Sequence, residues 1–137
     1  MPADVFSDTS FSELRREALD AERWNLLHPD RPPRVPYVRA CLDGREGPFV
    51  AATDYVRTVP DQIRQWVPGR YQVLGTDGYG RSDSRAALRD FFEVDRRYVV
   101  VAALKALADE GRLDAATVSA AIQRLGIDPD KPNPVTV

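Results

Sequence analysis

The stretch from Tyr71 to Phe92, YQVLGTDGYGRSDSRAALRDFF, decides the fold class because it combines a strand, a glycine-rich turn and a helix. Residues 71–76 give the best strand signal in the chain, residues 77–85 form a turn-rich loop, and residues 84–92 have helical character. Strands that alternate with helices in this way are typical of α/β domains. We therefore expect an α/β fold with a mainly parallel sheet flanked by helices.

The rest of the sequence adds further helices and strands on both sides of this stretch. Ser10 is predicted to cap the first helix in a capping box with Glu13, and that helix should end before Pro29. Asp95 should cap a long buried helix whose C-cap is Gly111. The other elements that we expect are strands at 3–8 and 49–54, an irregular proline-rich segment at 29–48, a helix at 55–67 beginning near Pro60, and a last helix from Asp114 to Gly126.

The number of strands is small for this fold class. Only three segments are credible strands, whereas a parallel sheet is normally covered by helices on both faces and contains more strands than that. The sequence therefore predicts that part of the sheet is supplied from elsewhere.

The composition excludes several classes of function. The chain has 137 residues, of which 43% are hydrophobic and 29% are charged, as is typical of a single globular domain. Its net charge of −2 is evenly spread, without a basic tail or stripe, so nucleic acid is not an expected partner. No apolar run approaches the roughly 18 residues of a membrane span, and no signal peptide is visible at the N-terminus. These features favour a cytoplasmic protein.

Few residues could form a self-contained catalytic site. Cys41 is the single cysteine, which excludes an intrachain disulfide and a cysteine-based metal cluster. His28 is the single histidine, so a histidine-based zinc site would need another chain. His28 could act as an acid or base near neutral pH, but no known motif ties a nucleophile to it, and a helix C-terminus also favours histidine. Trp24 could lie in the core or at a subunit interface, and the sequence does not decide between them.

The glycine-rich loop allows two interpretations. Its glycines follow a strand and precede a helix, as in a phosphate-binding loop. Their spacing matches neither the dinucleotide-binding nor the P-loop motif, and Asp77 and Asp83 would repel phosphate. We therefore expect a tight connection at a packed interface, with Ser82 or Asp83 capping the helix. The residues assigned to this interface or structural role are Asp77, Gly78, Tyr79, Gly80, Arg81, Ser82, Asp83 and Arg85, together with Trp24 and His28 outside the loop.

Several stretches, in order along the chain, carry a resemblance to a known family. They are ADVFSDTSFSEL (3–14), ERWNLLHP (22–29), RVPYV (34–38), AATDY (51–55), YQVLGTDGYGRSDSR (71–85) and FFEVDRRYVVVAAL (91–104). Together they resemble the C-terminal region of homodimeric bacterial pyruvate dehydrogenase, the decarboxylating component that depends on thiamine diphosphate. The likeness covers nearly the whole chain and ends in a similar D-x-x-K-x-N-P tail, and its long glycine-rich string is far more specific than a lone glycine motif.

The resemblance implies a transketolase C-terminal-like domain over residues 1–137 that lacks the first strand and helix of the family domain. It also implies thiamine diphosphate and magnesium in the parent enzyme. The chain contains neither the family's G-D-G triplet nor its N-x-N stretch, and the family's active-site histidines lie upstream of this region. His28 matches an L-H-P turn that supplies no catalytic base. We therefore expect that this chain binds no cofactor or metal and contributes no catalytic residue.

The role implied by the resemblance is a non-catalytic domain or subunit that supports folding and dimer assembly of a pyruvate dehydrogenase. The implied partners are the thiamine-binding domains, as other chains or a missing segment, a second copy of the parent enzyme, and the lipoyl acyltransferase component. Neither nucleic acid nor membrane is expected. Two alternatives remain: a stand-alone binding or regulatory module that uses residues 77–85 for a regulator or anion, and a subunit of a split transketolase-like enzyme with a different substrate.

Overall fold

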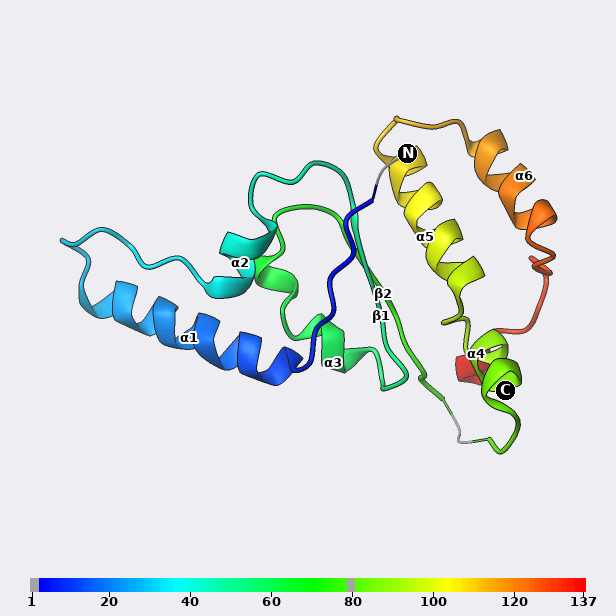
Figure 1. The fold of residues 1–137 in the computed structure, drawn as a ribbon, viewed down its shortest axis with the longest axis horizontal. Coiled ribbons are helices and arrows are strands. Elements are labelled where there is room, and N and C mark those ends of the chain that lie inside the picture. The colour runs from blue at the N-terminus through cyan, green and yellow to red at the C-terminus, as the bar shows by residue number, and fades with distance from the viewer. Residues whose placement is uncertain (1–2, 79–80) are drawn as a thin grey trace. The chain divides into compact units, whose positions relative to one another are not determined.

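The computed structural model describes residues 3–78 and 81–137 (Figure 1). The elements in chain order are α1 (Phe11–Leu27), α2 (Tyr37–Leu42), β1 (Phe49–Ala52), α3 (Thr58–Asp61), η1 (Arg64–Trp66), β2 (Tyr71–Leu74), α4 (Arg85–Phe91), α5 (Arg96–Asp109), α6 (Ala115–Arg124) and η2 (Pro134–Thr136). The chain divides into two compact units. The first unit contains Met1–Gly44 and Gln62–Pro68, and the second contains Arg45–Asp61 and Gly69–Val137.

The first unit is organised by α1. The hydroxyl of Ser10 accepts a hydrogen bond from the N–H of Glu13 at 3.2 Å, which confirms the predicted N-cap. The predicted capping box is wrong, because the N–H of Ser10 donates to Asp8 Oδ1 and the Glu13 carboxylate pairs with Arg16 instead. The helix ends at Leu27, before Pro29, as predicted. The carboxylate of Glu22 accepts a hydrogen bond from Trp66 Nε1 at 2.9 Å, so α1 is linked to η1 through the buried indole of Trp66.

The predicted strand at residues 3–8 is wrong. The segment pairs with neither described strand, and its side chains Val5 and Phe6 are 93% and 53% exposed. A strand needs the backbone of a neighbour in register, and the apolar character of a segment does not supply that neighbour.

Two further expectations need correction. The irregular segment at 29–48 contains the short helix α2, because its inner prolines precede the helix and Pro36 stands at the N-cap with a φ of −54°. The helix expected over 55–67 is instead divided into α3 and η1. Pro60 lies inside α3 and has no N–H to donate, so a longer helix would lack a hydrogen bond there.

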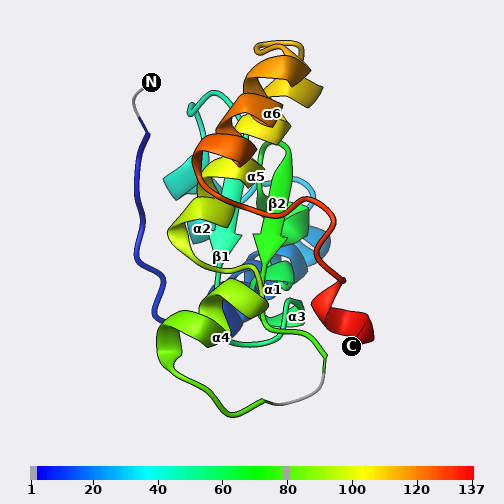
Figure 2. The ribbon, with the colours of Figure 1, turned by 90° about the vertical axis from the view of Figure 1, so that its right-hand side faces the viewer.

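The second unit is built on a parallel pair of strands. β1 and β2 lie side by side in Figure 2, and their register pairs Phe49 with Tyr71 and Ala52 with Leu74. The N–H of Phe49 donates to Arg70 O at 2.8 Å, and the N–H of Thr53 donates to Leu74 O at 3.0 Å. These two strands confirm the predicted segments 49–54 and 71–76 in position, and the parallel pairing agrees with the expected α/β class.

The core of this unit forms where α4 and α5 meet the sheet. Leu74, Phe92 and Val94 are buried in its centre. Partly buried apolar side chains pack around them, namely Val50, Leu88, Phe91, Tyr98, Val99 and Ala102. Burial of such side chains contributes about 1.5–3 kcal/mol each to folding.

The structure places Asp95 and Asp114 at the predicted N-cap positions of α5 and α6, but only Asp95 makes a capping bond. The side chain of Asp95 accepts hydrogen bonds from two N–H groups at the start of α5, and Gly111 follows its end with a φ of +76°. Asp114 occupies the N-cap position of α6, but its side chain makes no capping bond. The expectation that α5 is a buried helix needs correction: only Ala106 and Leu107 are buried along it, most of its other residues are half-buried or exposed, and Val100 is 45% exposed. No helix in residues 3–78 and 81–137 is both long and apolar enough to span a membrane.

Candidate functional site

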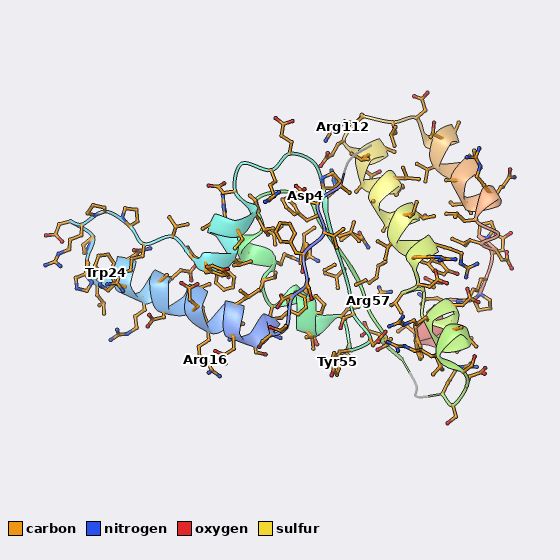
Figure 3. The ribbon with its side chains drawn as sticks, in the orientation of Figure 1. Asp4, Arg16, Trp24, Tyr55, Arg57 and Arg112 are labelled. Atoms are coloured by element: carbon orange, nitrogen blue, oxygen red, sulfur yellow. The ribbon has the colours of Figure 1, made fainter. Side chains whose placement is uncertain are left out.

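The glycine-rich loop leaves β2 through a set of bonds with the segment that follows β1. The N–H of Thr76 donates to Tyr55 O at 2.9 Å. The carboxylate of Asp77 accepts a hydrogen bond from the N–H of Arg57 at 2.9 Å and lies 3.9 Å from Arg57 Nε. Figure 3 labels Tyr55 and Arg57, which both follow β1 in the chain. Asp77 is therefore a structural acceptor that joins the two strand ends.

Gly78 allows the loop to approach the C-terminal tail. Its φ is +107°, a region that residues with a side chain rarely adopt. A Cβ atom at this position would lie 2.8 Å from Pro134 O, closer than real Cβ contacts come. Pro134 is itself buried, so the backbone of the tail is fixed against the loop.

The loop ends in a hydrogen-bonded helix start. The hydroxyl of Ser84 accepts a hydrogen bond from the N–H of Ala87 at 3.2 Å, so Ser84 caps α4, and the expectation that Ser82 or Asp83 would do so is wrong. Asp83 instead accepts a hydrogen bond from the N–H of Ser84 at 2.7 Å, one residue before the helix. Arg85 is the first residue of α4 and is exposed.

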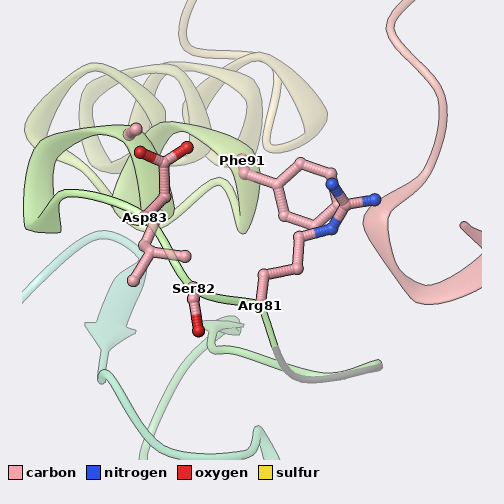
Figure 4. Close-up of a pocket in the computed structure, with 6 residues that line it drawn as sticks. Arg81, Ser82, Asp83 and Phe91 are labelled. Carbon is pink, nitrogen blue, oxygen red and sulfur yellow. The ribbon is translucent and has the colours of Figure 1, made fainter.

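A small hollow lies between the loop and α4 (Figure 4). Its volume is about 210 Å³, and it is lined by Arg81, Ser82, Asp83, Ala87, Leu88 and Phe91. The guanidinium carbon of Arg81 lies 3.9 Å from the centre of the Phe91 ring, within the range of a cation–π contact. The loop thus supplies the polar wall of the hollow and α4 supplies the apolar wall.

Lys131 in the C-terminal tail contacts the same helix end. Its Nζ donates to Phe91 O at 2.8 Å and lies 3.3 Å from the carboxylate of Glu93. It also lies 5.1 Å from the centre of the Phe91 ring. Lys131 was not among the predicted site residues. It is 40 positions from Phe91, and no spacing rule relates residues so far apart in sequence.

Trp24 and His28 belong to the first unit. Their rings stack with centres 4.4 Å apart, and the ring N–H at His28 Nδ1 donates to Trp24 O at 2.8 Å. The guanidinium carbon of Arg34 lies 4.1 Å from the centre of the Trp24 ring. His28 is the C-cap residue of α1, which agrees with the structural interpretation of this histidine. Tyr79 and Gly80, also assigned to the interface loop, lie outside the described residues.

An ionic network that the sequence did not predict lies at the start of α5. The guanidinium of Arg97 binds the carboxylates of Asp95 and Asp90. Partial burial tends to raise the pKa of Asp95, but hydrogen bonds from the Arg97 side chain and from two backbone N–H groups outweigh it, so the pKa lies below its usual value. Burial raises the pKa of Tyr98 to about 12, with a further contribution from Asp90 and Glu93.

The described residues do not fit a metal–diphosphate site. Within residues 3–78 and 81–137, no three His, Cys, Asp or Glu side chains are grouped so that they could hold a metal ion. The glycine-rich loop presents Asp77 and Asp83, which carry the same sign of charge as a diphosphate. That cofactor binding in the parent enzyme depends on other residues remains a prediction.

Comparison with known proteins identifies the family. The family model described as the transketolase-like TK C-terminal domain matches residues 1–95. The chain belongs to this family. The resemblance noted from the sequence and the expected transketolase C-terminal-like α/β fold are thereby confirmed.

Similar chains occur in bacterial pyruvate dehydrogenase E1 components. The chain is 59% identical over 134 residues to the E1 component of Pseudomonas aeruginosa, covering 97% of this chain and 15% of that protein. It is 55% identical over 135 residues to the E1 component of Cupriavidus necator and 53% identical over 133 residues to that of Escherichia coli K12. These matches cover 98% and 96% of this chain and 15% of each relative. This member of the transketolase-like C-terminal family thus spans about 15% of the length of these relatives.

Proposed function

We propose that this chain acts as a non-catalytic C-terminal domain or subunit of a thiamine-diphosphate-dependent pyruvate dehydrogenase. Its contribution is to complete the fold and to support assembly of the enzyme dimer. The parent reaction is decarboxylation of pyruvate and transfer of the acetyl unit to a lipoyl group on an acyltransferase component, in the cytoplasm. The identity of 59% to an E1 component over nearly the whole chain supports this proposal.

The observation that carries the assembly role is the open edge of β1. In a parallel pair, alternate residues direct both backbone polar groups to the same neighbour. Phe49 and Thr53 bond to β2, so Val50 and Ala52, in the intervening register, direct their N–H and C=O groups away from it. Among the described residues no other strand pairs with this edge. Unpaired strand edges are templates for a further strand.

The small size of the sheet also supports the addition of a further strand. Two-stranded sheets are marginal in water, and parallel sheets in particular are normally enclosed within a larger sheet. β1 has its backbone edge open and Ala52 exposed, whereas Val73 and Leu74 in β2 are buried. A strand from the remainder of the enzyme, added beside β1, would complete the sheet.

A replacement experiment tests the proposal. The matching 134 residues of the Pseudomonas aeruginosa E1 component are exchanged for this chain, and subunit state and pyruvate decarboxylation are measured. We expect the same oligomeric state as the unaltered relative and activity within about tenfold of it. A monomeric or inactive protein that retains folded upstream domains would overturn the proposal and favour a stand-alone module.

A further inference from the structure

We propose that the hollow between the glycine-rich loop and α4 is an interaction surface for a polypeptide segment in which an apolar side chain lies close to a carboxylate. This inference rests on the proposed function, because the segment would come from another part of the same enzyme assembly. The surface, here called the Arg81 hollow, consists of Arg81, Ser82, Asp83, Ala87, Leu88 and Phe91.

The size of the Arg81 hollow favours a single side chain as its occupant. Pockets for drug-sized molecules and cofactors generally measure about 300–1,000 Å³. The Arg81 hollow measures about 210 Å³ and is open to the surface. A cofactor would find little enclosure there, whereas one apolar side chain from a partner could contact Ala87, Leu88 and Phe91 together.

The charges around the hollow indicate a carboxylate beside that side chain. Arg81 makes no ion pair within residues 3–78 and 81–137, although its guanidinium stacks on the Phe91 ring. Arg85 likewise has no carboxylate partner in the described part of the chain. An arginine at the rim whose guanidinium has no carboxylate partner can bind a carboxylate through two parallel hydrogen bonds. Asp83 at the same rim disfavours a diphosphate, which carries more negative charge.

The hollow is also held in place before any partner binds. Stacking on Phe91 limits the rotamers of Arg81, and the Lys131 ammonium bonds to Phe91 O and Glu93. Close approach of Pro134 to Gly78 fixes the other end of the loop. A surface that is ordered beforehand loses less conformational entropy on binding. Arginine and aromatic side chains in such positions are frequent centres of binding energy in protein interfaces.

Photo-crosslinking in the replacement protein tests this inference. A p-benzoylphenylalanine is introduced in place of exposed Ser82, the purified protein is irradiated, and crosslinked peptides are sequenced by mass spectrometry. We expect one dominant crosslink to a segment outside this chain, with an Asp or Glu within a few residues of an apolar side chain. Gel mobility then distinguishes a crosslink within one subunit from a crosslink between subunits.

Variants of Arg81 separate the inference from the proposed function. Arg81→Glu and Arg81→Leu should each lower the crosslink yield at least fivefold, and the second retains apolar contact with Phe91. Arg124→Glu, at an exposed α6 arginine without an ion pair in the described part of the chain, should change the yield less than twofold. The inference would be overturned if Arg81→Glu and the parent gave equal crosslink yields, or if the crosslinked segment contained no carboxylate. Either result would leave the proposed role in assembly unaffected. A replacement protein that fails to assemble overturns the proposed function and this inference with it.

Discussion

At the level of single residues, Gly78 is a position where both the backbone conformation and the neighbouring atoms oppose a side chain. We expect Gly78→Ala to lower the free energy of unfolding by about 2–3 kcal/mol, because it combines a positive φ with a contact to the tail backbone. Urea unfolding at low protein concentration measures the change.

Gly126→Ala is the matched control for this change. Gly126 also has a positive φ, of +69°, but a Cβ there would meet nothing within 4 Å. Its substitution should cost about 1 kcal/mol, the expense of the backbone conformation alone. Equal losses at the two positions would show that the contact between Gly78 and the tail contributes nothing to stability.

Tyr98 should make the fold sensitive to alkali. Its pKa of about 12 exceeds the ordinary value of 10.0, so the folded state favours the protonated phenol. The associated stability is fully present below pH 10 and is lost as the pH rises through 12. Tyr98→Phe should remove this decline between pH 10 and 12, whereas Tyr55→Phe, at an exposed ring, should leave it unchanged. The free energies of unfolding of the parent and both variants, measured across this pH range, test the prediction.

At the level of elements, the start of α5 depends on one carboxylate. Asp95→Ala should lower the free energy of unfolding by about 1–2 kcal/mol at pH 7, because it removes the N-cap and a partner of Arg97. Asp114→Ala should cost less, since Asp114 makes no capping bond at the start of α6. Chemical denaturation of both variants gives the comparison, and a larger loss at Asp114 would contradict this account.

The contribution of Asp95 to stability should also depend on pH. The pKa of Asp95 is lower in the folded state than its ordinary value of 3.8, so its contribution to stability is present above that value and is lost as the pH falls through the folded pKa. The stability difference between the parent and Asp95→Ala should therefore shrink on acidification below about pH 4. A difference that stays constant to pH 2 would show that the charge of Asp95 is not involved.

The elements differ in how far the sequence could predict them. The boundaries set by Ser10 and Asp95 were predictable because a cap acts within one turn of its own helix. The strand expected at 3–8 was wrong because pairing depends on a neighbour that the local sequence does not contain. The short helix α2 was missed because a proline-rich segment gives no periodic signal over six residues.

The candidate site was predictable only in part. The loop itself could be found from its glycines and its place between a strand and a helix. Its environment could not, because the contact of Arg81 with Phe91 and that of Phe91 with Lys131 join distant positions. The pairing of Arg97 with Asp90 was missed for a different reason: the two residues are close in sequence but lie on different helices, so helical spacing does not relate them.

At the level of the whole molecule, the open edge of β1 should make the isolated chain self-associate. Ala52→Pro removes an N–H that points away from β2 and should reduce association, as proline does on natural edge strands. Ala51→Pro is the control, because it removes a bond to β2 and should destabilise the pair instead. Static light scattering and thermal melting distinguish the two effects. A monodisperse parent chain with a sharp melting transition would contradict the prediction.

The isolated chain should also lack pyruvate decarboxylase activity in the presence of thiamine diphosphate and magnesium. The described residues offer no grouping suited to a metal ion, and the sequence lacks the family's diphosphate motif. The expected rate is that of a protein-free control in a carbon dioxide release assay. Turnover that persists after removal of trace full-length enzyme would overturn the assignment.

The interleaving of the two units along the chain limits how the molecule can be dissected. Residues 62–68 of the first unit are inserted between the two strands of the second unit, so no single cut yields both units intact. A gene fragment that ends after Gly44 would lack η1 and Trp66, and a fragment that begins at Arg45 would carry that helix without α1. A recombination point anywhere between Gly44 and Gln62 would therefore divide the first unit, because its two parts lie on opposite sides of that point.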